Sequence, residues 1–192
     1  LIRELRQAFV ESAHRQIDLM SRSRCDANWH YSCLRLKGLA ASFDAVELLS
    51  LADEASEGAP GDPVVLRKLG AALTHIGEVM HKGERIPLVA SGTRMGDAIL
   101  EISSKGFGCV GITRNDGRLA GIITDGDLRR HIGKDLLSMQ VDDVMTKNPK
   151  TVAADTLVAK ALDLVNSSKI TALMIVEDGR PAGIVHLHDL LR

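Results

Sequence analysis

Aromatic residues and net charge are both scarce in this sequence of 192 residues. Only 3% of the residues are Phe, Trp or Tyr, so the core must be built from aliphatic side chains. The few aromatics also leave little surface on which the bases of a single-stranded nucleic acid could stack. The formal net charge of −1 gives no positive surface for unselective binding to duplex DNA or to an acidic membrane. We therefore expect neither a nucleic-acid partner nor a membrane partner.

Cysteines and long apolar runs are scarce as well. Cys25, Cys33 and Cys109 are odd in number and lack C-x-x-C spacing, so neither a disulfide framework nor a zinc site is predicted. No apolar run approaches the roughly 18 residues of a membrane span, and the first six residues mix charged and apolar side chains, unlike a signal sequence. With 45% hydrophobic and 26% charged residues, the composition is typical of a globular protein, which we expect to be cytoplasmic and free of metal.

The first 76 residues have a helical period. Apolar side chains recur every three or four residues in two stripes, as in amphipathic helices packed on their neighbours. The stripes are Leu5, Phe9, Ala13, Ile17 and Met20, and then Leu36, Leu39, Ala40, Phe43, Val46, Leu49 and Ala52. Asp62 followed by Pro63 predicts the N-cap of a further helix that runs through Ile76. This pattern predicts a small antiparallel helical bundle.

The sequence repeats itself beyond residue 77. Short β-rich runs alternate there with helical periods, and an Asp-Gly turn separates two strands in each copy. The clearest repeated pairs are Val79-Met80 with Val144-Met145, and Asp127-Leu-Arg-Arg with Asp189-Leu-Leu-Arg. Such a duplication predicts two copies of one supersecondary unit, each covering the apolar face of the other. The predicted fold class is α+β, with a helical bundle followed by the duplicated unit.

Polar residues mark the point where the last strand of each repeat meets a helix. Thr124 ends the strand in the first copy, and Asp127 falls in the first turn of the helix. In the second copy Asp189 takes the place of the carboxylate, but His186 stands where the hydroxyl would be. Backbone N–H groups at a helix start favour an anion, and a carboxylate accepts hydrogen bonds from a diol, although the same residues equally suit simple helix capping. His186 and His188 are predicted to point in opposite directions, as alternate residues of a strand, which disfavours a joint metal site.

This arrangement resembles the CBS domain, and the paired repeat resembles a tandem CBS pair, or Bateman module. The resemblance places the first repeat at residues 77–133 and the second at 134–192. It implies that Thr124 contacts a phosphate and that Asp127 and Asp189 accept hydrogen bonds from ribose hydroxyls. It also implies a homodimer through the CBS modules, with Arg129 or Arg130 reaching the ligand's phosphates or a sister chain.

Longer stretches of the duplicated unit resemble the C-terminal half of D-arabinose 5-phosphate isomerases, which begin the synthesis of the Kdo sugar of bacterial lipopolysaccharide. These stretches are residues 77–89, 107–111, 124–130, 143–146 and 185–192. In that family catalysis belongs to an N-terminal sugar-isomerase (SIS) domain, whereas the first 76 residues here are too few for a doubly wound sheet. The resemblance therefore implies a regulatory half without a catalytic residue or a required cofactor, and an adenine nucleotide or CMP-Kdo as regulatory ligand.

Residues 34–48 resemble the core of a histidine phosphotransfer (HPt) domain, whose signature is His-x-x-Lys-Gly. The resemblance covers residues 1–67, which a connecting helix at 68–76 joins to the repeats. Lys37 and Gly38 match the signature, but Leu34 occupies the phosphoacceptor position and has no nucleophilic nitrogen. His30, one helical turn earlier, is the alternative acceptor. Gly38 is predicted to mark the close approach of another backbone.

Three functions follow from these features. The leading hypothesis is a non-catalytic module that binds a nucleotide or nucleotide sugar between two CBS repeats and acts on an attached or partner isomerase domain. The first alternative is a signalling adaptor whose HPt-like bundle docks response regulators. The second is a part of an active arabinose 5-phosphate isomerase. Ligand binding, phosphorylation of His30 and isomerase activity of the purified chain discriminate among them.

Overall fold

The computed structural model describes residues 2–132 and 135–191, which form two compact units. One unit consists mainly of the chain up to Thr74, and the other mainly of the chain from His75 onward. The first is all helical and the second combines helices with two mixed sheets, so the predicted α+β fold class is confirmed. The boundary predicted between residues 133 and 134 lies outside the described residues.

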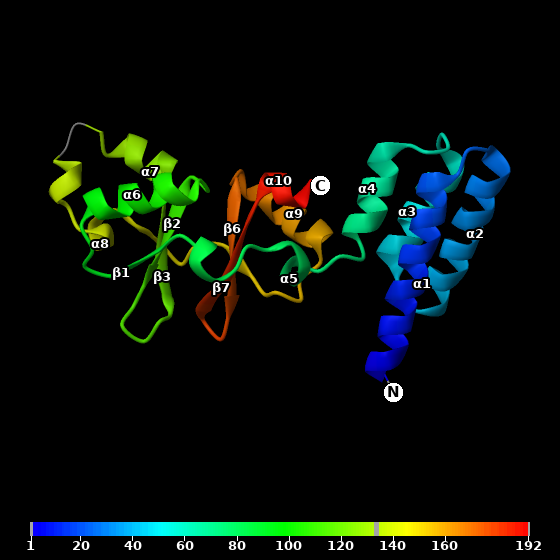
Figure 1. Cartoon of the computed structure of the whole chain (residues 1–192), viewed down its shortest axis with the longest axis horizontal. Helices are drawn as coiled ribbons and strands as arrows, with labels where there is room; N and C mark the ends of the chain where they lie inside the picture. The colour runs from blue at the N-terminus through cyan, green and yellow to red at the C-terminus, as the bar shows by residue number, and fades with distance from the viewer. Residues whose placement is uncertain (1, 133–134, 192) are drawn as a thin grey trace. The chain divides into compact units, whose positions relative to one another are not determined.

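Four helices make up the first unit (Figure 1): α1 (Ile2–Arg22), α2 (Asp26–Ser42), α3 (Val46–Glu57) and α4 (Pro63–Ala71). Consecutive helices pack against each other, and α1 also contacts α4, which closes the bundle. Trp29 is fully buried in its core and donates a hydrogen bond from Nε1 to the carbonyl oxygen of Ala55 at 2.8 Å. The predicted helical bundle is therefore present.

Two details of the helical prediction are wrong. The apolar stripe predicted to run from Leu36 to Ala52 is interrupted, because Asp44 adopts a left-handed φ of 53° between α2 and α3. Phe43 and Val46 consequently lie exposed at the ends of these helices. The helix that begins after the Asp62 cap, which accepts from the Val64 amide at 2.8 Å, stops at Ala71 and does not continue through residue 76.

Two sheets form the frame of the second unit. The first has the order β1 (Leu88–Ala90), β2 (Cys109–Thr113), β3 (Leu119–Thr124) and β4 (Thr146–Lys147). The second has the order β5 (Thr151–Val152), β6 (Ala172–Glu177) and β7 (Arg180–His186). In both sheets a short parallel strand precedes an antiparallel hairpin, so the duplication read from the sequence is also a structural one.

Helices connect and cover these strands. The longer ones are α6 (Met95–Lys105) and α9 (Val158–Ser168), which precede the hairpins. Two short helices follow directly on the last strands, α7 (Asp125–Arg130) after β3 and α10 (Leu187–Leu190) after β7. The remaining single turns are α5 (Ile76–Val79), α8 (Val141–Val144) and the 3₁₀ turns η1 (Gly83–Arg85) and η2 (Leu136–Ser138).

Each repeat completes its strand pairing with the first residues of the other repeat. We call these residues the leading segment: it lies around His81 in the first repeat and around Thr146–Lys147 in the second. Strand β4 belongs to the start of the second repeat but pairs antiparallel with β3 of the first, with Ile122 opposite Thr146. Reciprocally, His81 at the start of the first repeat exchanges two backbone hydrogen bonds with Ile184 on β7, at 2.9 and 3.0 Å. A shared core that includes Phe107, Cys109 and Met174 joins the two repeats. The unit is therefore a single interlocked body.

Glycine permits this exchange. A Cβ built on Gly121 of β3 would lie 2.7 Å from the Met145 sulfur and 2.8 Å from the Thr146 carbonyl oxygen. Gly183 of β7 meets the Met80 side chain and the His81 carbonyl oxygen in the same way. The repeated Ala-Gly-Ile sequence thus marks the two places where a leading segment crosses the last strand of the other repeat.

Candidate functional site

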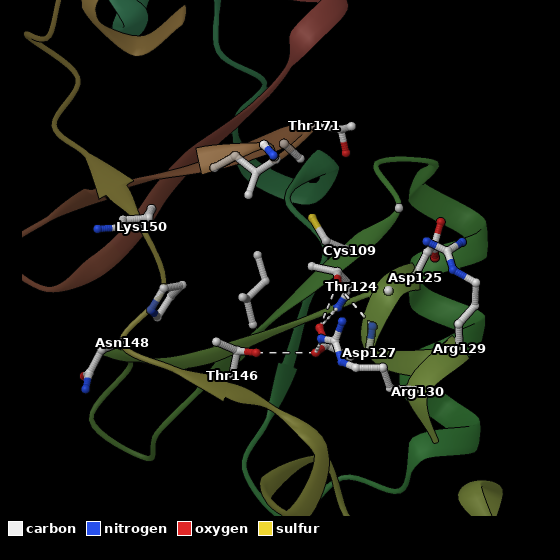
Figure 2. Close-up of a pocket in the computed structure, with 17 residues that line it drawn as sticks. Cys109, Thr124, Asp125, Asp127, Arg129, Arg130, Thr146, Asn148, Lys150 and Thr171 are labelled. Atoms are coloured by element: carbon white, nitrogen blue, oxygen red, sulfur yellow. Dashed lines mark hydrogen bonds and ion pairs between the residues drawn. The ribbon is translucent and has the colours of Figure 1, made fainter. Parts of the chain in front are cut away.

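A pocket of about 660 Å³ opens where β3 meets α7 (Figure 2). The first repeat lines it with Thr124, Asp127 and neighbouring residues, and the second repeat with two segments, 146–150 and 169–172. The second of these segments leads into β6, so both repeats are needed to form the pocket. The predicted pair at the end of β3 therefore lies at a cavity and not merely at a helix start.

Thr124 and Asp127 hold each other at the start of α7. Thr124 is the N-cap, and both its hydroxyl and its amide donate to Oδ2 of Asp127, at 2.7 and 2.8 Å. The Asp127 amide donates in return to the Thr124 hydroxyl at 3.4 Å, which completes a capping box. Asp127 is only 4% exposed. The helix-capping role that the sequence also allowed for Thr124 and Asp127 is thus present. The capping box fixes the carboxylate at the pocket wall.

The second carboxylate oxygen of Asp127 has its own donors. Arg130, one helical turn later, forms an ion pair with Oδ1, and the Thr146 hydroxyl donates to the same atom at 3.4 Å. Burial works to raise the pKa of Asp127, but the hydrogen bonds from Thr124 and Arg130 outweigh it and hold the pKa below its ordinary value. The group is therefore charged at neutral pH.

Basic side chains outnumber acidic ones around the pocket. Arg129 and Arg130 line it from α7, and Lys150 and Lys169 from the second repeat, against the carboxylates of Asp125 and Asp127. The four basic and two acidic side chains give the lining a net charge of +2, which makes the pocket suitable for an anion. The wall also holds the buried thiol of Cys109, whose pKa is raised to about 12 by burial and by the Asp125 charge, so it is a neutral surface at physiological pH.

The sequence predicted part of the lining that comes from the first repeat. Thr124, Asp127 and Arg129 were predicted, and the structure brings all three to the pocket. Thr146, Lys150 and Lys169 were missed, because they come from the other repeat and reach the pocket only through the strand exchange. The signal for Thr146 was the repeated Val-Met pair directly before it, which marks the start of the leading segment.

Asp189 and His186 repeat the same local geometry at the end of β7. His186 caps α10, and its amide donates to Asp189 Oδ2 at 2.9 Å. The Nε2 atom of His81 lies 3.1 Å from the same oxygen, at the position that corresponds to Thr146 in the first half. These residues are not among those that line the pocket, so the structure separates them from Thr124 and Asp127.

The prediction that His186 and His188 point in opposite directions is wrong. Their rings stack with centroids 5.0 Å apart, because β7 ends at His186 and the chain turns into α10, where strand alternation no longer applies. Across residues 2–132 and 135–191, no group of three or more His, Cys, Asp or Glu side chains is placed to hold a metal ion.

The candidate phosphotransfer residues all lie on α2. Leu34 is 64% exposed, and Lys37 forms an ion pair with Asp53 of α3. His30 is exposed, with Nδ1 2.9 Å from the Asp26 carbonyl oxygen. The expectation for Gly38 is wrong, because a Cβ there would meet no atom within 4 Å, so no other backbone comes close.

No helix in the described part of the chain is long and apolar enough to cross a membrane.

The three cysteines are free thiols, with Cys25 exposed and Cys33 and Cys109 buried.

Curated relatives include arabinose 5-phosphate isomerases. The enzyme KdsD of Pseudomonas aeruginosa is 45% identical over 123 residues, which are 62% of this chain and 38% of that protein. KdsD of Escherichia coli K12 is 37% identical over 122 residues, 62% of this chain and 37% of that protein. The chain thus spans well under half of the length of these relatives. The comparisons support the resemblance of its CBS region to theirs, and they do not support the phosphotransfer resemblance of the N-terminal helices.

The solved structure of CBSX2 in complex with AMP is similar to the second unit in fold. It is 25% identical, aligns with a TM-score of 0.54, and covers 62% of this chain and 93% of that one. The sequence model of the CBS domain matches residues 76–134 and 141–192, which is more than half of the chain. Together with the duplicated strand–helix units and their exchanged leading segments, this match shows that the chain belongs to the CBS domain family.

Proposed function

We propose that the CBS pair is a regulatory module that binds a nucleotide in the pocket at Thr124 and Asp127. The observation that carries this proposal is the pocket itself, to which one repeat contributes a buried, charged carboxylate and both repeats contribute basic side chains. A ligand in that position touches both repeats, so its binding free energy depends on how they are arranged. This dependence is what lets a ligand shift a conformational equilibrium.

The chemistry of the lining favours a nucleoside phosphate. An ionised carboxylate only accepts hydrogen bonds, which suits the two hydroxyl donors of a ribose, whereas Arg and Lys only donate, which suits a phosphate. The AMP in the solved structure of CBSX2 supports an adenine nucleotide as the ligand. A volume of about 660 Å³ is within the range of small-molecule sites and admits a mononucleotide or a nucleotide sugar such as CMP-Kdo.

The likeness to arabinose 5-phosphate isomerases supports a role in Kdo synthesis. In this proposal the CBS pair works as the regulatory half of such an enzyme, pairs with a second copy through its CBS modules, and acts on an isomerase domain. None of its own residues is assigned a catalytic role, and no cofactor is required. The exchange of strands between repeats supports this role, because it makes one body through which an occupied pocket acts on its surroundings.

The test is isothermal titration of the whole chain with AMP, ADP, ATP, CMP and CMP-Kdo. We expect saturable binding of at least one of them, with the affinity reduced at least tenfold by Asp127→Asn, which keeps the size of the side chain and removes its charge. The matched control is Asp163→Asn, the same change at an exposed position of α9 outside the pocket, which should bind like the unmodified chain. Absence of binding, or an equal loss in both variants, would overturn the proposal.

A further inference from the structure

The carboxylate of Asp127 is fully occupied before any ligand arrives. Oδ2 accepts from the hydroxyl and amide of Thr124, and Oδ1 from Arg130 and the Thr146 hydroxyl. A carboxylate offers about four lone-pair positions in all. The two hydroxyls of a ribose can therefore be accepted only if some of these donors leave.

The donors differ in how easily they leave. The Thr124 amide belongs to the backbone of the capping box of α7 and cannot turn away, whereas the Thr124 and Thr146 hydroxyls can rotate but carry no charge that a ligand phosphate would attract. Arg130 holds Asp127 only by its long side chain, which is 67% exposed, while the Asp127 side chain is 6% exposed. Rotation about side-chain bonds alone is enough to release it.

The released guanidinium remains at the pocket. Arg130 lines the cavity from α7, with its side chain beside the carboxylate of Asp127 (Figure 2). Release of Arg130 takes a charge-assisted hydrogen bond from the buried carboxylate of Asp127, so the exchange is favoured when another anion replaces Asp127 as the partner of Arg130. A phosphate on the same ligand is such an anion.

We propose that Arg130 is a specificity-determining latch, which pairs with Asp127 in the empty pocket and transfers to the phosphate of the ligand as the ribose takes its place. This inference rests on the proposed function and deepens it. The latch makes a nucleoside without phosphate a poorer ligand, because the nucleoside must break the Arg130–Asp127 pair and offers Arg130 no anion in return. Recognition of the ribose and of the phosphate is thereby coupled through one side chain.

The experiment uses Arg130→Met in the whole chain, with AMP and adenosine, and CMP and cytidine, as two probe pairs. The informative pair is the one whose nucleotide the unmodified chain binds. Compared with the unmodified chain, we expect the variant to bind that nucleotide more weakly and the matching nucleoside more tightly. The ratio of the two affinities should fall by about tenfold or more, as expected for the loss of a charge-assisted hydrogen bond. Arg130 is exposed, so the variant should fold, which circular dichroism checks.

Arg129→Met is the matched control. Arg129 lines the same pocket from the same helix but forms no ion pair with Asp127 in the described structure. We expect this control to weaken nucleotide binding and to leave nucleoside binding unchanged. A gain in nucleoside affinity in both variants, or in neither, would overturn the latch while leaving the proposed function intact. Failure of the unmodified chain to bind AMP, CMP or any other nucleotide of the titration above overturns the proposed function, and the latch with it.

Discussion

Asp127 stabilises the fold in its charged form only. Because its pKa lies below the ordinary value of 3.8, the native state holds this stabilisation at any pH above that value and loses it as pH falls through the lowered pKa. We expect Asp127→Asn to lower the free energy of unfolding near neutral pH, and the difference from the unmodified chain to shrink below pH 3.8. Urea unfolding at a series of pH values measures this difference. A difference that stays constant into strong acid would contradict it.

The three thiols are expected to differ in reactivity. Cys25 is exposed, whereas burial raises the pKa of Cys33 and raises that of Cys109 to about 12. The thiolate is the reactive form, so a disulfide reagent such as DTNB at pH 8 should modify Cys25 rapidly and the other two slowly. Titration of the native chain should give one fast equivalent, and titration in denaturant three. A Cys25→Ser variant should lose the fast phase alone.

Residues whose role is set by local sequence were the predictable ones. Thr124 and Asp127 lie three positions apart at a strand end, and that spacing alone defines a capping box. Lys150 and Lys169 gave no such signal, because their position at the pocket depends on pairing across the repeats. Gly38 was misread because its neighbourhood depends on how the helices pack, which leaves it facing open space.

Two elements meet closely where β4 crosses β3, and substitutions at two glycines, Gly121 and Gly38, test this contact. Gly121→Ala would place a Cβ 2.8 Å from the Thr146 carbonyl oxygen and should destabilise the second unit by about 1–3 kcal/mol, as overpacking does. Gly38→Ala, on the open face of α2, should stabilise the first unit by about 0.5–1 kcal/mol, because alanine favours helix. Thermal unfolding measures both. Equal effects of the same sign would contradict the assigned contact.

The elements themselves were predictable to different extents. The strand–turn–strand–helix order of each repeat follows from the Asp-Gly turns and the alternation around them, and the structure has it. The break between α2 and α3 was missed because the apolar period continues through it and only the φ of Asp44 interrupts the helix. The pairing of each leading segment with the other repeat likewise leaves no periodic pattern in the sequence, since β4 has only two residues.

At the scale of the whole molecule, the only tryptophan reports on one unit. Trp29 is buried in the helical bundle, and the second unit contains no tryptophan. A nucleotide at about 100 times its Kd should stabilise the unit that binds it by about 2.7 kcal/mol. We therefore expect hydrogen exchange to slow in β2 and β3 when the ligand is added, while the unfolding transition followed by Trp29 fluorescence stays where it was. A matching shift of the fluorescence transition would show instead that both units unfold together.

The reciprocal strand exchange also sets an order of events during synthesis on the ribosome. His81 and its partner Asp189 are 108 residues apart in the chain, so the segment around His81 leaves the ribosome long before β7 exists. Strand β3, by contrast, meets β4 after fewer than 30 further residues. The first sheet can therefore close while translation continues, whereas the segment around His81 lacks its strand partner until β7 has been made. A chaperone that shields nascent chains would find its longest-lived target in the residues just before β1.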